Sequence, residues 1–353
     1  MAAAAWQGGM YLFGGVGANN LSESILDVSD ELWHWCARDG VWTQVARQGD
    51  WPSARRCVGW VAHGGFLWLY GGSGVCETPS GDLRYTFLND LWRFDPRTGC
   101  WMCLRVSDDH RQAPSAAPDG CVVPVPRYTP VWQPVGEEML LFGGYTEDLL
   151  GKRKLNDAWL FGEFGWRQVP PQEPAGYQPG SRWPGVRYGC MSANDGSRAY
   201  ICGGFADDGD HNDVWRFDPQ RQAWELMSCD TTSPSAPSPR YCAAFAYYDN
   251  ALYLFGGRSR RYPKQNFNDL WRFDFTSCAW HQLSPHREPH CYQGSEGFPG
   301  YHAKSASTVV GTSWYIWGGE GLHGHVSDLW QFNFLAHEWR LVQPARADDP
   351  VFW

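Results

Sequence analysis

A pair of glycines that follows a short apolar run occurs six times in this chain, and this repeat constrains the fold more than any other feature. The second glycines of the pairs are Gly15, Gly72, Gly144, Gly204, Gly257 and Gly319. They are 57, 72, 60, 53 and 62 residues apart, so one unit is used six times in the 353 residues. A repeat of this length is typical of units that bury their apolar faces against copies of themselves.

Each unit carries further residues in a fixed register. Downstream of the glycines, a phrase such as NDLW ends in a tryptophan, at Trp33, Trp92, Trp159, Trp215, Trp271 and Trp330. A second tryptophan follows nine residues later in five units and seven residues later in the third. Upstream, a position 16 residues before the first glycine holds Arg55, Arg127, Arg187, Arg240 or His302, and a proline stands three residues before each arginine. In the first unit this position would precede Met1, so we expect the chain to begin at the first strand of that unit.

The apolar runs within a unit predict short strands. The fifth unit, for example, contains YCAAFAYY, LYLFGG, DLWRFD and AWHQL, separated by turn-forming residues. Four antiparallel strands in about 50 residues are typical of a β-propeller blade. The glycine pair, the spaced tryptophans and the proline–arginine opening resemble Kelch repeats, and the resemblance covers essentially the whole chain.

The resemblance implies an all-β fold, a six-bladed Kelch-type β-propeller with four antiparallel strands in each blade. We predict a single propeller domain over residues 1–353, with blades at about 1–46, 52–105, 124–169, 184–228, 237–284 and 298–343. The run MAAAAW would form the inner strand of the first blade, without an exchanged strand. The tail, residues 344–353, is a candidate for closing the ring, with Pro344 and Arg346 in place of the missing proline–arginine opening.

Composition narrows the class of partner. The net charge of −9 argues against general binding to nucleic acid or to an anionic membrane. No window reaches the roughly 18 apolar residues of a membrane span. We therefore predict a monomeric propeller in the cytoplasm, with the nucleus as an alternative, and no nucleic-acid or membrane partner.

Ligands are expected on the face where strand two connects to strand three, because variable loops gather there. That face should also receive the strand-one openings. The binding candidates at the openings are Arg55, Arg127, Arg187, Arg240 and His302, and those after the glycine pairs are Tyr145, Phe205, Arg258 and Glu320. The insert RSRRYPK adds Arg260 and Arg261.

Guanidinium groups bind carboxylates in a bidentate manner, so we predict a protein or peptide partner with acidic groups or a C-terminal carboxylate. Kelch receptors of C-terminal degrons use arginines from comparable loops, and this resemblance reaches Arg258 and, loosely, Arg260. It implies a protein-interaction module or substrate-recognition scaffold, with a ubiquitin-ligase adaptor as one form.

Several alternatives stay open. An arginine repeated in every blade also suits a structural residue bonded to carbonyls or to an adjacent carboxylate, and charged loops can simply pair with their neighbours. The aspartate before each strand-three tryptophan is expected to cap backbone N–H groups in its turn.

A sugar-acid mutarotase or epimerase, or a carbohydrate-binding propeller, would use Glu320 beside His302 for proton transfer. The sequence assembles no catalytic set, no cofactor site and no metal site, so a binding role is favoured over an enzymatic one.

Overall fold

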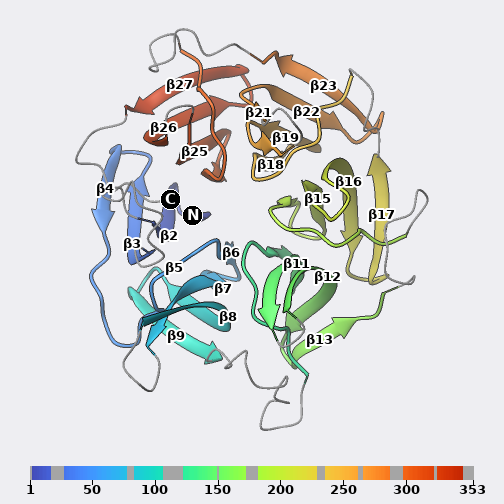
Figure 1. The fold of residues 1–353 in the computed structure, drawn as a ribbon. Helices are drawn as coiled ribbons and strands as arrows, with labels where there is room; N and C mark the ends of the chain where they lie inside the picture. The colour runs from blue at the N-terminus through green and yellow to red at the C-terminus, as the bar shows by residue number, and fades with distance from the viewer. Residues whose placement is uncertain are drawn as a thin grey trace.

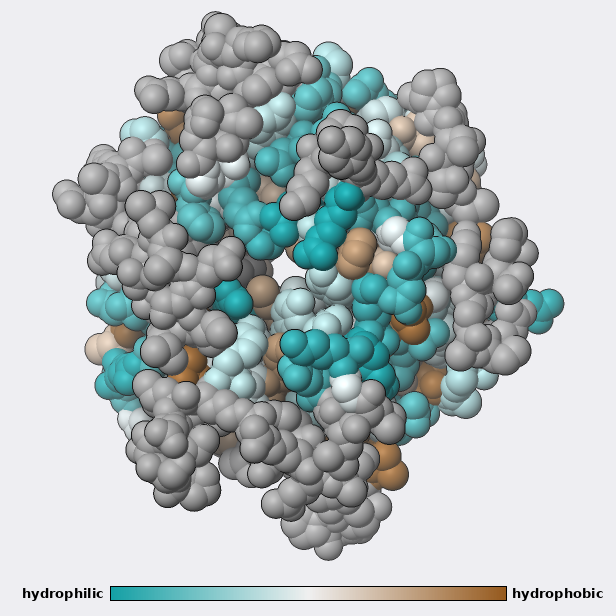
Figure 2. Space-filling model, viewed as in Figure 1, coloured by the Kyte–Doolittle hydropathy of each residue, from teal (hydrophilic) through white to brown (hydrophobic). Residues whose placement is uncertain are grey.

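The computed structural model describes residues 2–16, 28–77, 83–105, 122–148, 151–171, 182–228, 235–260, 265–286, 297–321 and 324–344. In these residues six antiparallel sheets stand radially around a common centre (Figure 1), which is open as a channel in the space-filling view (Figure 2). The predicted six-bladed β-propeller is confirmed. No helix long and apolar enough to cross a membrane occurs among the described residues.

The blades follow one another in chain order. Blade one contains β1 (Ala2–Trp6), β2 (Gly9–Val16), β3 (Val28–Cys36) and β4 (Val41–Gln44). Blade two contains β5 (Arg55–Arg56), β6 (Gly59–His63), β7 (Phe66–Glu77), β8 (Leu83–Asp95) and β9 (Cys100–Arg105). Blade three contains β10 (Val131–Val135), β11 (Glu138–Asp148), β12 (Gly151–Gly162) and β13 (Gly165–Val169).

The second half of the ring repeats this arrangement. Blade four contains β14 (Met191–Asn194), β15 (Ala199–Phe205), β16 (Asp210–Asp218) and β17 (Ala223–Ser228). Blade five contains β18 (Ala244–Tyr248), β19 (Ala251–Phe255), β22 (Leu270–Asp274) and β23 (Ala279–Ser284), and a two-stranded sheet of β20 (Arg258–Ser259) and β21 (Gln265–Asn266) accompanies it. Blade six contains β24 (Ala306–Val310), β25 (Ser313–Glu320), β26 (His325–Asn333) and β27 (Glu338–Gln343).

Apolar side chains fill the spaces between neighbouring blades. Because side chains alternate along a strand, each sheet has one face toward either neighbour. Between blades three and four, the ring centroids of Phe142 and Trp224 are 4.8 Å apart, and Leu140 and Ile201 lie in the same buried cluster. Contacts of this kind supply much of the apolar burial that holds the ring together.

In blades two to five the glycine pair joins the blade to the next one through the main chain. Gly203 has a φ of +57°, and a Cβ added there would lie 2.6 Å from the carbonyl oxygen of Arg240 in the following blade. Gly204 donates its N–H to that same oxygen, at 3.0 Å. The register of the two flanking strands shifts at this point. Only glycine provides both the left-handed backbone and the space for this close approach.

The ring closes with no strand exchanged between the first and last blades among the described residues. All four strands of blade one come from residues 2–44, and all four of blade six come from residues 306–343. The Trp42 indole N–H donates to Gln343 Oε1 at 3.0 Å, and the centroids of Trp42 and Trp317 are 4.8 Å apart. The candidate closing tail, apart from Pro344, lies outside the described residues.

Candidate functional site

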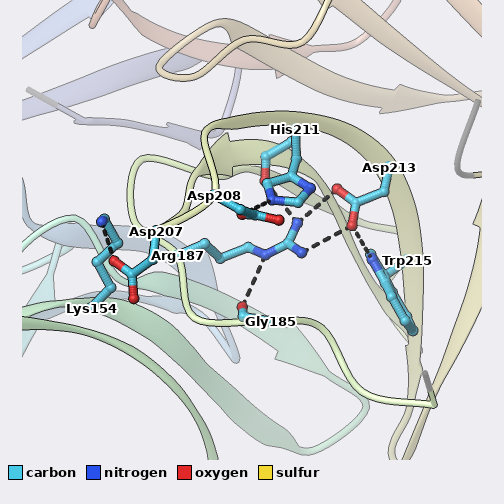
Figure 3. A network of polar contacts seen from close by, with 9 residues as sticks. Lys154, Gly185, Arg187, Asp207, Asp208, His211, Asp213 and Trp215 are labelled. Atoms are coloured by element: carbon cyan, nitrogen blue, oxygen red, sulfur yellow. Dashed lines mark hydrogen bonds and ion pairs between the residues drawn. The ribbon is translucent and has the colours of Figure 1, made fainter. Parts of the chain in front are cut away.

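The arginine that opens strand one lies inside its blade, as Figure 3 shows for blade four. Arg187 is 0% exposed and donates to the carbonyl oxygens of Gly185 and Gly203 at 3.1 and 3.0 Å. Its other N–H groups bind both oxygens of Asp213 at 2.7 and 2.9 Å. Asp213 also accepts the indole N–H of Trp215 at 2.6 Å. Burial alone would raise the pKa of Asp213, but the Arg187 guanidinium outweighs burial and holds that pKa below its usual value.

Three other blades repeat this network. The ion pairs are Arg55 with Asp90, Arg127 with Asp157 and Arg240 with Asp269. Each of these arginines is at most 1% exposed and also donates to the first glycine carbonyl of its own blade. These contacts are the ones expected of a structural arginine, bonded to carbonyls and to an adjacent carboxylate. All four predicted binding candidates are buried inside their blades and do not reach the channel mouth.

The repeated aspartates, predicted to cap backbone N–H groups, also have side-chain donors as partners. In the four arginine-containing blades, the aspartate carboxylate accepts the guanidinium and the indole N–H two residues along the strand. These carboxylates therefore link the arginine, aspartate and tryptophan that recur at fixed positions in these four units.

His302 takes the position of the arginine in blade six. Its Nδ1 lies 2.9 Å from the Gly318 carbonyl oxygen and its Nε2 lies 3.6 Å from Asp328 Oδ2, with the residue 1% exposed. Burial alone would lower the pKa of His302, but the Asp328 carboxylate and the Gly318 carbonyl outweigh it and raise the pKa above 6.5. His302 thus contacts the same two kinds of group, a glycine carbonyl and an aspartate carboxylate, as the arginines of blades two to five.

We expect His302 to make the stability of the propeller depend on pH. Because its folded-state pKa is raised, its contribution is complete below its unfolded pKa, about 6.5, and is lost as pH rises through the folded value. The difference in the free energy of unfolding between the wild type and His302→Gln should therefore shrink from pH 6 to pH 8. Chemical denaturation at both pH values measures it, and a difference that stays constant or grows would contradict this assignment.

The proton-transfer pair considered for a sugar-acid enzyme is not brought together. Both ring nitrogens of His302 face Gly318 and Asp328, inside the blade. The carboxylate of Glu320 instead pairs with Arg258 and Lys304. No metal-binding group of three or more His, Cys, Asp or Glu residues occurs in the part of the chain that the structure describes.

In blades two to six the channel mouth is built from paired positions, one after the glycine pair and one after the strand-one arginine or histidine. The bridges join Arg56 to Ser73, Tyr128 to Tyr145, Tyr188 to Phe205, Tyr241 to Arg258 and Ala303 to Glu320. The hydrogen bonds of these bridges are main-chain bonds, so the same backbone presents different side chains in each blade. Figure 2 shows the mouth as a central opening with hydrophilic residues beside it.

Six aromatic side chains form a continuous arc at the mouth across blades two to five. This aromatic arc consists of Phe87, Tyr128, Tyr145, Tyr188, Phe205 and Tyr241. The ring centroids of Phe87 and Tyr128 are 5.1 Å apart, those of Tyr128 and Tyr188 are 5.8 Å apart, and those of Tyr188 and Phe205 are 5.5 Å apart. Tyr145 and Tyr241 contact the same rings. Tyr128, Tyr145 and Phe205 are half-buried and offer flat area to a ligand, whereas Phe87, Tyr188 and Tyr241 are buried behind them.

Two arginines of the predicted basic loop lie over the end of this arc in blade five. The Arg260 Cζ atom is 4.8 Å from the Phe205 centroid and 5.6 Å from the Tyr241 centroid, and Arg260 Nε donates to the Tyr241 hydroxyl at 3.0 Å. Arg258 Cζ is 5.1 Å from the Tyr241 centroid, and its Nη1 pairs with Glu320. Among the described residues, the guanidinium of Arg260 has no carboxylate partner. Arg261 lies outside the described residues.

The acidic loop of blade four pairs largely with its surroundings. Lys154 of blade three binds Asp207, and His211 Nε2 lies 2.8 Å from Asp208 Oδ1 (Figure 3). Asp210 accepts the Ser259 hydroxyl at 2.6 Å and the Arg260 N–H at 2.7 Å. These contacts agree with the alternative in which charged loops pair with their neighbours, and Asp210 fixes the main chain that carries Arg260.

The sequence interpretation missed several residues of the mouth, namely Arg56, Tyr85, Phe87 and Lys304. Arg56 follows Arg55 in the same register as Tyr128 follows Arg127, so the repeat itself contained the signal for it. Phe87 lies upstream of the NDLW phrase, where the repeat prescribes no aromatic residue, and no comparable signal existed.

Comparison with known proteins agrees with the repeat fold. The family model described as KLHDC2/KLHL20/DRC7 Kelch-repeats domain matches residues 116–294 and 232–350. The Leucine-zipper-like transcriptional regulator 1 homolog of Drosophila melanogaster is 25% identical over 350 residues, covering 94% of this chain and 30% of the relative. Human Kelch domain-containing protein 3 is 29% identical over 173 residues, covering 46% of this chain and 42% of the relative. Rat Kelch domain-containing protein 10 is 22% identical over 290 residues, covering 81% of this chain and 64% of the relative.

The chain spans less than two thirds of the length of each of these relatives. Kelch propellers generally bind protein partners, and the similarity to Kelch domain-containing proteins supports a protein-interaction scaffold. Since the family model matches more than half of the residues, the chain belongs to the Kelch-repeat family.

Proposed function

We propose that the propeller holds an acidic or C-terminal segment of a protein partner at the channel mouth. The observation that carries the proposal is the guanidinium of Arg260, which lies over Phe205 and Tyr241 and has no carboxylate partner among the described residues. A guanidinium stacked on aromatic rings keeps in-plane N–H groups that can bind a ligand carboxylate.

The neighbouring groups favour the same ligand. Burial raises the pKa of Tyr188, although Arg260 opposes the shift, so its phenol is neutral and can donate a hydrogen bond. Arg258 already binds a carboxylate, that of Glu320, which also pairs with Lys304. A ligand carboxylate would compete with Glu320 for Arg258, and this internal competitor would select against weakly held anions.

Such a propeller could act as a scaffold or as the substrate-recognition part of a ubiquitin-ligase adaptor. The adaptor role is proposed from the resemblance to Kelch receptors of C-terminal degrons. It requires that a second region, in this protein or in a partner, recruit the ligase.

The test is a binding screen with synthetic peptides that represent protein C-termini, each made as the free acid and as the C-terminal amide. We expect the wild type to prefer free acids, and Arg260→Gln to weaken them roughly tenfold or more, because hydrogen bonds to charged groups contribute about 1.5–3 kcal/mol. Fluorescence anisotropy measures both affinities.

Arg97→Gln is the matched control for this screen. Arg97 is 61% exposed and pairs with Asp95 in the turn between β8 and β9, at the other end of its blade from the mouth. The proposed function would be refuted if the wild type bound free acids and amides equally well. It would also be refuted if Arg260→Gln and Arg97→Gln lost the same amount of affinity for the free acids.

A further inference from the structure

We infer that Arg56 forms a second anion-binding position at the channel mouth, so that the segment bound there carries two anionic groups. The first group is the one that binds Arg260, and for this group the inference rests on the proposed function. The second position has its own structural basis in blade two.

Arg56 is held with its guanidinium available. Its Cζ atom lies 5.6 Å from the Tyr85 ring centroid, and its Nη2 donates to the Tyr85 hydroxyl at 3.4 Å. The Tyr85 hydroxyl donates its own proton to Ser73 Oγ at 2.5 Å, which leaves oxygen lone pairs for Arg56. No carboxylate pairs with Arg56 among the described residues, whereas the adjacent Arg55 donates to Asp90, Ser53 and Gly71.

The surroundings of Arg56 keep its guanidinium charged. The residue is half-buried, and burial alone would lower the pKa of its guanidinium. The electrostatic effects of Tyr85 and Cys57 outweigh burial and raise that pKa. A half-buried guanidinium that keeps its charge and has no carboxylate partner among the described residues can bind a carboxylate from a ligand. An anionic ligand would supply the missing charge.

The aromatic arc connects the two arginines without a break. Tyr85 contacts Phe87 at a centroid distance of 6.0 Å, and Phe87 stacks on Tyr128 at 5.1 Å. From Tyr128 the contacts continue through Tyr188 to Phe205, beneath Arg260. Burial raises the pKa of Tyr128, so its phenol remains neutral. This phenol can hydrogen-bond to a ligand between Arg56 and Arg260.

The positions of the two arginines require an extended ligand. Arg56 belongs to blade two and Arg260 follows β20 in blade five, three blades away in a ring of six (Figure 1). A single carboxylate or phosphate cannot reach both sides of the mouth. An extended peptide advances about 3.3–3.6 Å per residue, so a segment with an acidic side chain several residues before its C-terminus has the right form.

The test uses acetylated peptides with one glutamate, a spacer of one to eight serines and a free C-terminal carboxylate. Matched peptides carry glutamine in place of glutamate, or a C-terminal amide. We expect one spacer length at which the glutamate peptide binds wild-type protein about tenfold more tightly than the glutamine peptide. In Arg56→Gln this gain should vanish while the preference for the free acid remains, and in Arg260→Gln the preference for the free acid should vanish instead.

Arg93→Gln is the matched control, because Arg93 also stacks on an aromatic ring in blade two, with its Cζ 4.2 Å from the Phe66 centroid. It should leave both preferences unchanged, and thermal melting should show that all three variants remain folded. The inference is overturned if no spacer length gives a glutamate gain, or if the gain persists in Arg56→Gln. If acids and amides bind alike while the glutamate gain still depends on Arg56, the proposed function fails and the second anion position stands.

Discussion

Replacing Arg187 by methionine is expected to destabilise the propeller by about 3–5 kcal/mol, the typical cost of leaving one member of a buried ion pair without its partner. Arg187 is 0% exposed, and its ion pair with Asp213 is bidentate. Methionine would fill much of the space but would leave the Asp213 carboxylate charged in a dry site. The carbonyl oxygens of Gly185 and Gly203 would also lose their donor.

Equilibrium unfolding in urea, followed by tryptophan fluorescence, measures this loss. Arg216→Met is the control, since Arg216 pairs with the 60%-exposed Glu225 and an exposed pair contributes at most about 1 kcal/mol. Adding Asp213→Asn to Arg187→Met should recover part of the loss, because the amide oxygen can still accept the Trp215 indole. Equal stabilities of Arg187→Met and Arg216→Met would show that the buried network does not hold the blade.

Replacing Gly203 by alanine is expected to cost roughly 2–5 kcal/mol, from a left-handed backbone conformation and from overpacking together. The new Cβ would lie 2.6 Å from the Arg240 carbonyl oxygen, 2.7 Å from the His211 carbonyl oxygen and 2.9 Å from Met191 Cε. The first two contacts involve main chain that blades four and five share, so relaxation would have to open the joint between them.

The glycine at position 196 separates the two causes. Gly196 has a φ of +89° but no atom within 4 Å of an added Cβ, so Gly196→Ala should cost only about 1 kcal/mol, the conformational part. Thermal and urea unfolding of the two variants give the comparison. A loss for Gly203→Ala no larger than that for Gly196→Ala would mean that the blades do not approach each other as closely as described.

The sequence predicted the fold well because the repeat is imposed by local requirements. The glycine pair needs a left-handed backbone and a close main-chain approach, and these demands recur in every blade at the same register. Strand count, strand order and the paired tryptophans all follow from that register. The number of blades was therefore readable without any knowledge of loop structure.

The role of the strand-one arginines could not be decided from sequence. Arg55 and Asp90 are 35 residues apart and Arg187 and Asp213 are 26 residues apart, with loops of different length between them. Spacing along the chain therefore did not identify the carboxylate partner. The alternative of a structural arginine was available, but only the folded blade shows that both edges of the guanidinium are occupied.

The mouth was predicted in part, for a related reason. Residues directly after the glycine pairs could be assigned to it, and Tyr145, Phe205, Arg258 and Glu320 do lie in its bridges. The contacts between blades could not be assigned, because they join residues distant in sequence. Arg258 and Glu320, for example, are 62 residues apart and belong to different blades.

The main-chain bridges at the mouth separate recognition from folding. In five blades the same two backbone positions face each other, yet they carry arginine with serine, tyrosine with tyrosine, tyrosine with phenylalanine, tyrosine with arginine, and alanine with glutamate. The hydrogen bonds that hold these positions come from the backbone and make no demand on side-chain identity. A propeller of this kind can acquire a new partner through substitutions at ten positions, while the blades beneath remain unaltered.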